Sequence, residues 1–95
     1  MKVKVKFFAI ARELAGTPEE ELELDDGSTA KELLELVAGK YGESFREFIF
    51  DAKTGLPRSN LQFLVGENLL ADLDGLQTVL PDGAAFAIIP PVGGG

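Results

Sequence analysis

Apolar and polar residues alternate along two stretches near the start of the chain. Residues 2–7, KVKVKF, alternate lysines with valines and a phenylalanine, and residues 19–25, EEELELD, alternate through two leucines. A period of two is typical of a strand with one buried face. Between them, residues 9–16, AIARELAG, hold good helix formers and end on a glycine, which predicts a helical turn or a short helix. We expect the two strands to form an antiparallel pair.

A longer amphipathic segment follows the sequence DGST at residues 26–29. Thr29 followed three residues later by Glu32 matches a capping box, and Ser28 is the neighbouring candidate cap. Apolar residues then recur at spacings of three and four, which predicts one buried stripe on a helix of about three turns. The stripe consists of Ala30, Leu33, Leu34, Val37 and Tyr41, and Gly39 and Gly42 are the candidate ends of the helix.

The second half of the chain reads as a connecting segment followed by strands. In residues 43–60 the sequence FREFIF predicts a short helix over the core, and the remainder is rich in turn residues. Residues 61–65, LQFLV, predict a strand. A turn is expected at residues 66–68, a returning strand at 69–70, and a loop at 72–83 that has room for one helical turn.

Residues 84–89, AAFAII, predict a final strand that is apolar on both sides, with Phe86 and Ile88 on one side and Ile89 on the other. Near-continuous apolar character is typical of a central strand, so we expect the first and last strands to be parallel neighbours at the centre of the sheet. The order β–β–α–β–β with one amphipathic helix predicts an α+β fold of the β-grasp kind, a mixed sheet packed on one main helix.

Composition narrows the possible functions. The 95 residues include nine basic and sixteen acidic residues, a net charge of −7 that argues against nucleic acid and suits a partner with a basic groove. The chain has no cysteine and no histidine, so we expect neither an enzyme nor a metal centre.

The acidic run at residues 19–26 is interpreted as a solvated edge strand. The apolar runs are too short to span a membrane, and the alternating start is not a signal peptide, which predicts a cytoplasmic protein.

The last nine residues, AIIPPVGGG, combine two prolines with three terminal glycines. Prolines favour an extended, stiff run, whereas glycines bring no side chain and can thread a narrow channel. From Pro91 to Gly95 the tail can reach about 17 Å from the domain. We therefore interpret residues 1–90 as a single domain and residues 91–95 as a tail that presents its carboxylate to another protein's active site, against the alternative of a frayed terminus.

A terminal carboxylate needs activation before it can react, because oxide is a poor leaving group. Coupling to AMP supplies a good leaving group, and a sulfur nucleophile can then form a thiocarboxylate. All catalytic groups would belong to the partners, which is consistent with a chain that lacks histidine and cysteine.

Three segments of the chain resemble one family: the small sulfur-carrier subunit of molybdopterin synthase (MoaD-like) and its ubiquitin-like relatives, among them the thiamin sulfur carrier (ThiS-like) and the archaeal small modifier proteins. Residues 5–16 resemble the family's opening strand and helix, residues 26–37 its capped helix, and residues 80–95 its ending, Pro-Pro-Val, one variable residue and Gly-Gly. The longer segment 43–60 resembles the archaeal-type branch. Two turns depart from the family pattern, with GEN where Asn-Gly is usual and Ala84 where Asp is usual.

The resemblance implies that Gly95 is adenylated by an E1-like enzyme, which uses ATP, and is converted to a thiocarboxylate. The large subunit of molybdopterin synthase would then use this sulfur for the molybdenum or tungsten cofactor, and no cofactor would be bound by the chain itself. The tail residues leading to the reactive group are Pro91, Val92, Gly93 and Gly94.

The family also contacts its partners through apolar side chains on the open face of the sheet. The matching positions here are Phe8, Leu69 and Ile89, unless segment 43–60 covers them. Three other roles remain open: a protein modifier joined through Gly95 to lysines, a carrier for another sulfur pathway, and a β-grasp interaction module whose tail is incidental.

Overall fold

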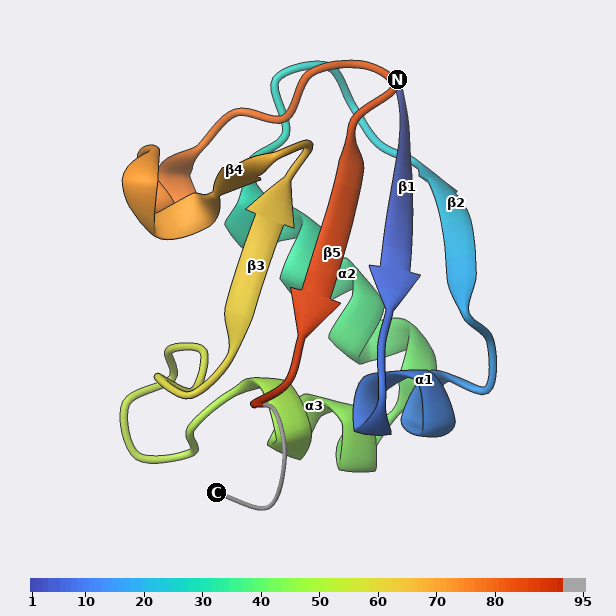
Figure 1. Ribbon diagram of the computed structural model, residues 1–95, viewed down its shortest axis with the longest axis vertical. Coiled ribbons are helices and arrows are strands. Elements are labelled where there is room, and N and C mark those ends of the chain that lie inside the picture. The colour runs from blue at the N-terminus through green and yellow to red at the C-terminus, as the bar shows by residue number, and fades with distance from the viewer. Residues whose placement is uncertain (92–95) are drawn as a thin grey trace.

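The computed structural model describes residues 1–91 and forms one sheet with helices behind it and at one end (Figure 1). The strands are β1 (Lys2–Phe7), β2 (Glu19–Glu23), β3 (Gln62–Val65), β4 (Asn68–Leu69) and β5 (Ala85–Ile89). The helices are α1 (Ile10–Ala15), α2 (Ala30–Tyr41) and α3 (Glu43–Ile49), and two short 3-10 turns occupy Leu70–Asp72 and Gly75–Gln77.

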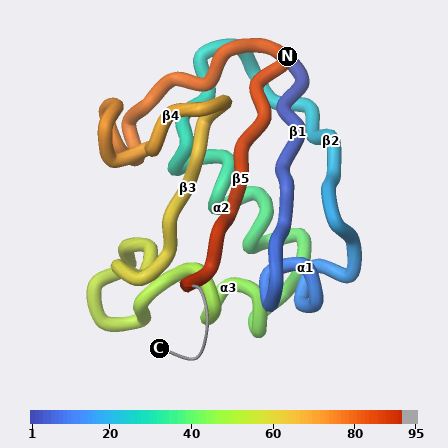
Figure 2. Tube along the Cα trace, in the orientation of Figure 1, coloured from blue at the N-terminus to red at the C-terminus, as the bar shows by residue number. Residues whose placement is uncertain are grey.

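The strands follow the order β2-β1-β5-β3-β4, with β1 and β5 running parallel and all other neighbours antiparallel. Figure 2 shows these two strands, blue and red, side by side at the centre. The prediction that the first and last strands are parallel central neighbours is therefore confirmed, as is the antiparallel pairing of β1 with β2. A parallel central pair flanked by antiparallel strands on one main helix is the predicted β-grasp arrangement.

The core lies between the sheet and α2, where the predicted apolar stripe packs. Side chains from β1 and β5 meet this helix because alternate residues of each strand point toward it. The most deeply buried members are Val3, Val5, Phe7, Leu33, Leu34, Val37, Phe86 and Ile88. The short helix predicted within residues 43–60 is α3, and it closes one end of the core with Phe45 and Ile49. The ring of Phe7 lies edge-on to that of Phe45, with centroids 5.7 Å apart.

The N-terminus of α2 carries the predicted capping box. The backbone N–H of Glu32 donates to Thr29 Oγ1 at 3.3 Å, and the backbone N–H of Thr29 donates to Glu32 Oε1 at 3.1 Å. Ser28 is not the cap, because its hydroxyl donates to the carbonyl oxygen of Asp25 at 2.7 Å. The helix continues through Gly39 and ends at Gly42, where the backbone φ of +93° suits glycine.

The predicted return strand at residues 69–70 is shifted by one residue. The turn consists of Gly66 and Glu67, and β4 begins at Asn68. Gly66 adopts a φ of +62°, which allows a tight two-residue hairpin in place of the expected three-residue turn. Leu70 then starts a 3-10 turn that buries its side chain, so the returning strand stops after two residues.

Candidate functional site

The chain leaves the sheet at the end of β5, next to the end of β1. Ile89 is half-buried, Pro90 is buried and Pro91 is exposed. Figure 1 shows this exit at the end of the molecule where α1 and α3 lie. The predicted tail residues Val92, Gly93, Gly94 and Gly95 lie outside the described residues, whose last member is Pro91.

The three predicted partner-binding residues share the face of the sheet that points away from α2. Phe8 follows the buried Phe7, and Ile89 follows the buried Ile88, so strand alternation turns both outward. The exposed fraction is 46% for Phe8 and 36% for Leu69. Segment 43–60 therefore does not cover these two side chains, because its helix α3 packs on the other side against α1 and α2.

Two further apolar residues fill the space between the predicted ones. Leu64 in β3 lies opposite Leu69 in β4 on one side and opposite Ala87 in β5 on the other. We call the resulting surface the open-face patch, defined as Phe8, Leu64, Leu69, Ala87 and Ile89. Leu64 was not predicted as a site residue, although its place between Phe63 and Val65, both buried, indicates that it faces outward.

The part of the open face formed by β1 and β2 is charged. Lys2, Lys4 and Lys6 of β1 lie opposite acidic residues of β2. Lys4 Nζ lies 3.2 Å from the carboxylate of Glu19, and both side chains are about half exposed. The acidic run of β2 thus forms a solvated, ion-paired edge, as predicted. Because β1 lies between β2 and β5, the lysines of β1 separate this acidic edge from most of the open-face patch, so the face has a charged side and an apolar side.

Glu20 is an acidic residue of β2 that, like Leu22, turns toward the helices. Its carboxylate accepts hydrogen bonds from Tyr41 Oη and Lys40 Nζ. Partial burial raises the pKa of Tyr41, and the hydrogen bond to Glu20 and its charge raise it further, to about 12. Partial burial also raises the pKa of Glu20, but the bonds from Lys40 and Tyr41 lower it by more. This cluster fastens the edge strand to α2 on the side away from the open-face patch, so its role is structural.

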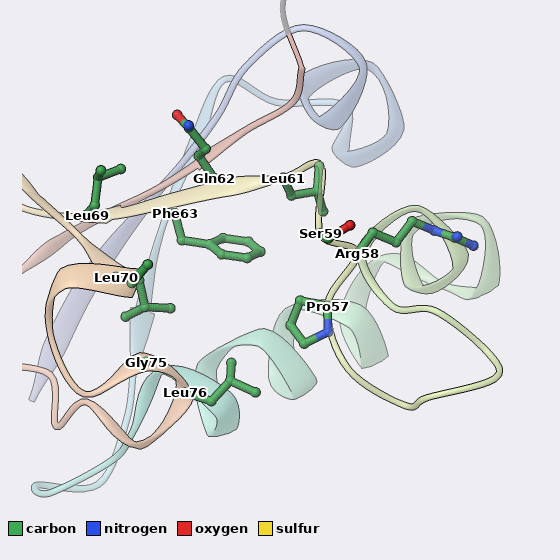
Figure 3. A pocket seen from close by; sticks show the side chains of 11 residues that line it. Pro57, Arg58, Ser59, Leu61, Gln62, Phe63, Leu69, Leu70, Gly75 and Leu76 are labelled. Atoms are coloured by element: carbon green, nitrogen blue, oxygen red, sulfur yellow. The ribbon is translucent and has the colours of Figure 1, made fainter.

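A hollow of about 390 Å³ lies beside β3, between segment 57–61 and the 3-10 turns. Figure 3 shows Phe63 and Leu70 on the hollow's side of β3 and Leu69 and Gln62 on the opposite side. The lining is mainly apolar, and it includes no carboxylate. Such a hollow can bind an apolar group but offers no acid–base chemistry.

Over the described residues no three carboxylates gather as a possible metal site. Across residues 1–91 no helix is both long and apolar enough to cross a membrane.

The whole sequence from residue 5 to residue 95 matches one protein-family model, that of the ThiS family. The chain belongs to the ThiS family. Among its relatives is the Small archaeal modifier protein 3 of Haloferax volcanii, 30% identical over all of both chains. The Molybdopterin synthase sulfur carrier subunit of Drosophila yakuba is 36% identical over all of this chain and 92% of that protein. The solution structure of small archaeal modifier protein 1 from Methanosarcina acetivorans aligns with a TM-score of 0.86 and 34% identity, over 99% of this chain and 96% of that one.

Membership in the ThiS family confirms the resemblance found in the sequence and, through the solved structure, the ubiquitin-like β-grasp fold. ThiS-family carriers are small proteins without catalytic activity of their own, and they work with E1-like activating enzymes and partner proteins. The relatives are named as molybdopterin sulfur carriers and as archaeal modifiers alike. This chain is therefore a sulfur carrier or a small modifier of that family.

Proposed function

We propose that this protein is a sulfur carrier whose Gly95 is adenylated and thiocarboxylated, and that it donates sulfur as the small subunit of molybdopterin synthase. The observation that supports the proposal most directly is the position of the open-face patch beside the exit of the tail. Phe8 directly follows β1, and Ile89 is the last residue of β5, at the end of the sheet where Pro90 leads into the tail that begins at Pro91. A partner that binds this apolar surface is therefore placed to receive the terminal carboxylate.

The chemistry proceeds in three balanced steps on partner enzymes. The carboxylate of Gly95 attacks the α-phosphorus of ATP, so an acyl adenylate forms and pyrophosphate leaves. A sulfur nucleophile then attacks the acyl carbon, the C–S bond forms, and AMP leaves. When that nucleophile is a persulfide, a thiol reduces its S–S bond and releases the thiocarboxylate. The thiocarboxylate sulfur then forms a C–S bond to the pterin precursor as an oxygen substituent of the precursor leaves. Water cleaves the acyl–sulfur bond, so the sulfur stays on the pterin and the free carboxylate returns. The chain itself binds no cofactor and supplies the docking surface and the tail.

The partners in this proposal are an E1-like adenylating enzyme and the large subunit of molybdopterin synthase, both in the cytoplasm. The net charge of −7 suits basic surfaces on these partners and disfavours nucleic acid. The match to molybdopterin carrier subunits at 36% identity supports this pathway.

The second candidate is a protein modifier joined through Gly95 to lysines of target proteins. The relative named Small archaeal modifier protein 3, which this chain matches over its full length, favours it. Both candidates require adenylation of Gly95, so they differ only in the acceptor of the activated acyl group.

The deciding experiment is the intact mass of the protein isolated from its own host under gentle, non-reducing conditions. The carrier role predicts a fraction that is heavier by the replacement of one oxygen with sulfur and that disappears when Gly95 is deleted. A Gly39→Ala variant, altered on the exposed side of α2, serves as the matched control and should keep this fraction. An unmodified mass together with isopeptide-linked conjugates would overturn the carrier role in favour of the modifier.

A further inference from the structure

A groove of about 300 Å³ opens beside the point where the chain leaves β5. It adjoins the open-face patch and shares Arg58 with the hollow beside β3, and we call it the tail-base groove. Its lining includes Ala9, Ile10, Phe48, Arg58, Pro90 and Pro91. Residues from the start of α1, from segment 43–60 and from the exit of the chain after β5 thus meet around one depression.

Arg58 is held at this groove by its own segment. Its backbone N–H donates to the carbonyl oxygen of Ile49 at 2.8 Å, and its Nε–H donates to the carbonyl oxygen of Glu47 at 2.8 Å. The terminal N–H groups of the guanidinium make no hydrogen bond or ion pair within residues 1–91. A guanidinium that is held by its Nε–H and has free terminal N–H groups can bind a carboxylate in a bidentate manner.

Apolar surface lies next to this cation. Ile10 is 52% exposed, and Phe48 is half-buried in the same groove. The complementary ligand is therefore a carboxylate beside an apolar side chain. The chain carries a net charge of −7, so most of its surface attracts basic regions of a partner. Arg58 is a cation on this surface, and it therefore favours an acidic segment of the partner at the groove.

The position of the groove limits what can occupy it. Pro91 forms part of its wall, and four residues separate Pro91 from the end of the sequence. An extended tail of four residues reaches about 14 Å. A protein that takes the carboxylate of Gly95 into an active site must therefore approach the surface around Pro91. The groove also continues the open-face patch, because Ala9 follows Phe8 and Pro90 follows Ile89.

We propose that the tail-base groove docks an acidic segment of the E1-like activating enzyme, with a carboxylate on Arg58 and an apolar side chain against Ile10 and Phe48. This inference rests on the proposed adenylation of Gly95 and extends it to a second contact surface. It also gives a role to segment 43–60, which supplies Phe48 and Arg58 and which packs away from the open-face patch.

The test measures ATP–pyrophosphate exchange by the activating enzyme of the same organism at varied concentrations of this protein. Arg58→Glu should raise KM by about tenfold or more, the loss expected for a close charge pair at an interface, while kcat stays unchanged. Arg58→Gln should raise KM by a smaller factor. Lys53→Glu is the matched control, because Lys53 is an exposed cation of the same segment that is absent from the groove lining, and its KM should stay within about twofold of the wild type.

Substitution of Arg58 also removes its hydrogen bond to Glu47 within segment 43–60. A second variant that leaves this bond intact, and a salt series, therefore separate an effect on binding from an effect on the segment. Ile10→Ser, on the opposite wall, should also raise KM. Added salt should raise KM for the wild type more steeply than for Arg58→Gln, because it screens the pair that the variant lacks. Equal KM values for Arg58→Glu and Lys53→Glu would overturn the proposed contact at the groove but not the proposed adenylation of Gly95. Absence of exchange with the wild type would overturn the adenylation of Gly95 itself.

Discussion

Phe7, the last residue of β1, lies opposite Ile88, the last but one of β5, in the parallel ladder between the two strands. Because the strands are parallel, they finish at the same edge of the sheet, and the next residue of each, Phe8 and Ile89, turns to the open face. A side chain from the beginning of the chain is thereby placed beside the start of the tail. This pairing assembles the surface on which the proposed function depends.

The open-face patch should contribute to partner binding through Phe8. Phe8→Ala is expected to weaken binding to the E1-like enzyme or to the large subunit by about 1–3 kcal/mol, the range typical of an aromatic anchor at an interface. Because Phe8 is nearly half exposed and lies outside the core, the free energy of unfolding should change by less than about 0.5 kcal/mol. Isothermal titration calorimetry and urea unfolding measure the two quantities.

The matched control for Phe8 is Leu36→Ala. Leu36 is 44% exposed, similar to Phe8, but it lies on α2, behind the sheet. Its truncation should leave both binding constants unchanged. Equal effects of the two substitutions would show that partners do not use the open face.

The capping box of α2 should contribute measurably to stability. Thr29→Ala removes the hydroxyl that accepts from the backbone N–H of Glu32, at a cost of about 1 kcal/mol in the free energy of unfolding. Thr29→Ser keeps the hydroxyl and should retain most of the stability. Urea unfolding followed by circular dichroism compares them, and equal loss in both variants would argue that the cap is not the cause.

The bonds to Glu20 should make stability depend on acid pH. The pKa of Glu20 is lowered in the folded protein, so the stabilisation is present above the ordinary pKa of a glutamate and is lost as pH falls through the lowered pKa. Glu20→Gln should therefore be less stable than the wild type near neutral pH, and this difference should shrink in acid. Urea unfolding over a pH series measures it, and a difference that stays constant into acid would contradict the ionised bond.

The same cluster predicts a loss of stability in alkali. The pKa of Tyr41 is raised to about 12 in the folded protein. Folding favours the neutral form of Tyr41. Its contribution to the free energy of unfolding is therefore fully present below the ordinary pKa of tyrosine, and it is lost as pH rises through about 12. Tyr41→Phe should remove this part of the alkaline decline, as ultraviolet difference spectroscopy and thermal unfolding at high pH can establish.

The backbone at Ala9 is strained. Ala9 has a φ of +51° and a ψ of −125°, a conformation that suits glycine. Ala9→Gly should raise the free energy of unfolding by about 1 kcal/mol, because relief of strain exceeds the added entropy of the unfolded chain. Ala52→Gly, in an exposed turn without positive φ, should lower it by about 0.5 kcal/mol. The same sign for both substitutions would contradict the strain.

Much of the fold could be predicted because its signals are local. The alternation around Val3 and Val5 indicated a half-buried strand, and the apolar character of residues 84–89 indicated a central one. The spacing from Thr29 to Glu32 located the start of α2 to the residue. The end of β4 could not be predicted, since it depends on Leu70 turning into a core built by distant segments.

Within the candidate site, the sequence alone determined which residues lie on the outer face of each strand, because side-chain direction alternates along any strand. It also determined the family, through motifs that extend to the end of the chain. Tertiary structure alone decided that segment 43–60 packs against the helices and leaves Phe8 exposed. It alone brought Arg58 to the base of the tail. These outcomes depend on packing between residues far apart in the chain, which local spacing does not encode.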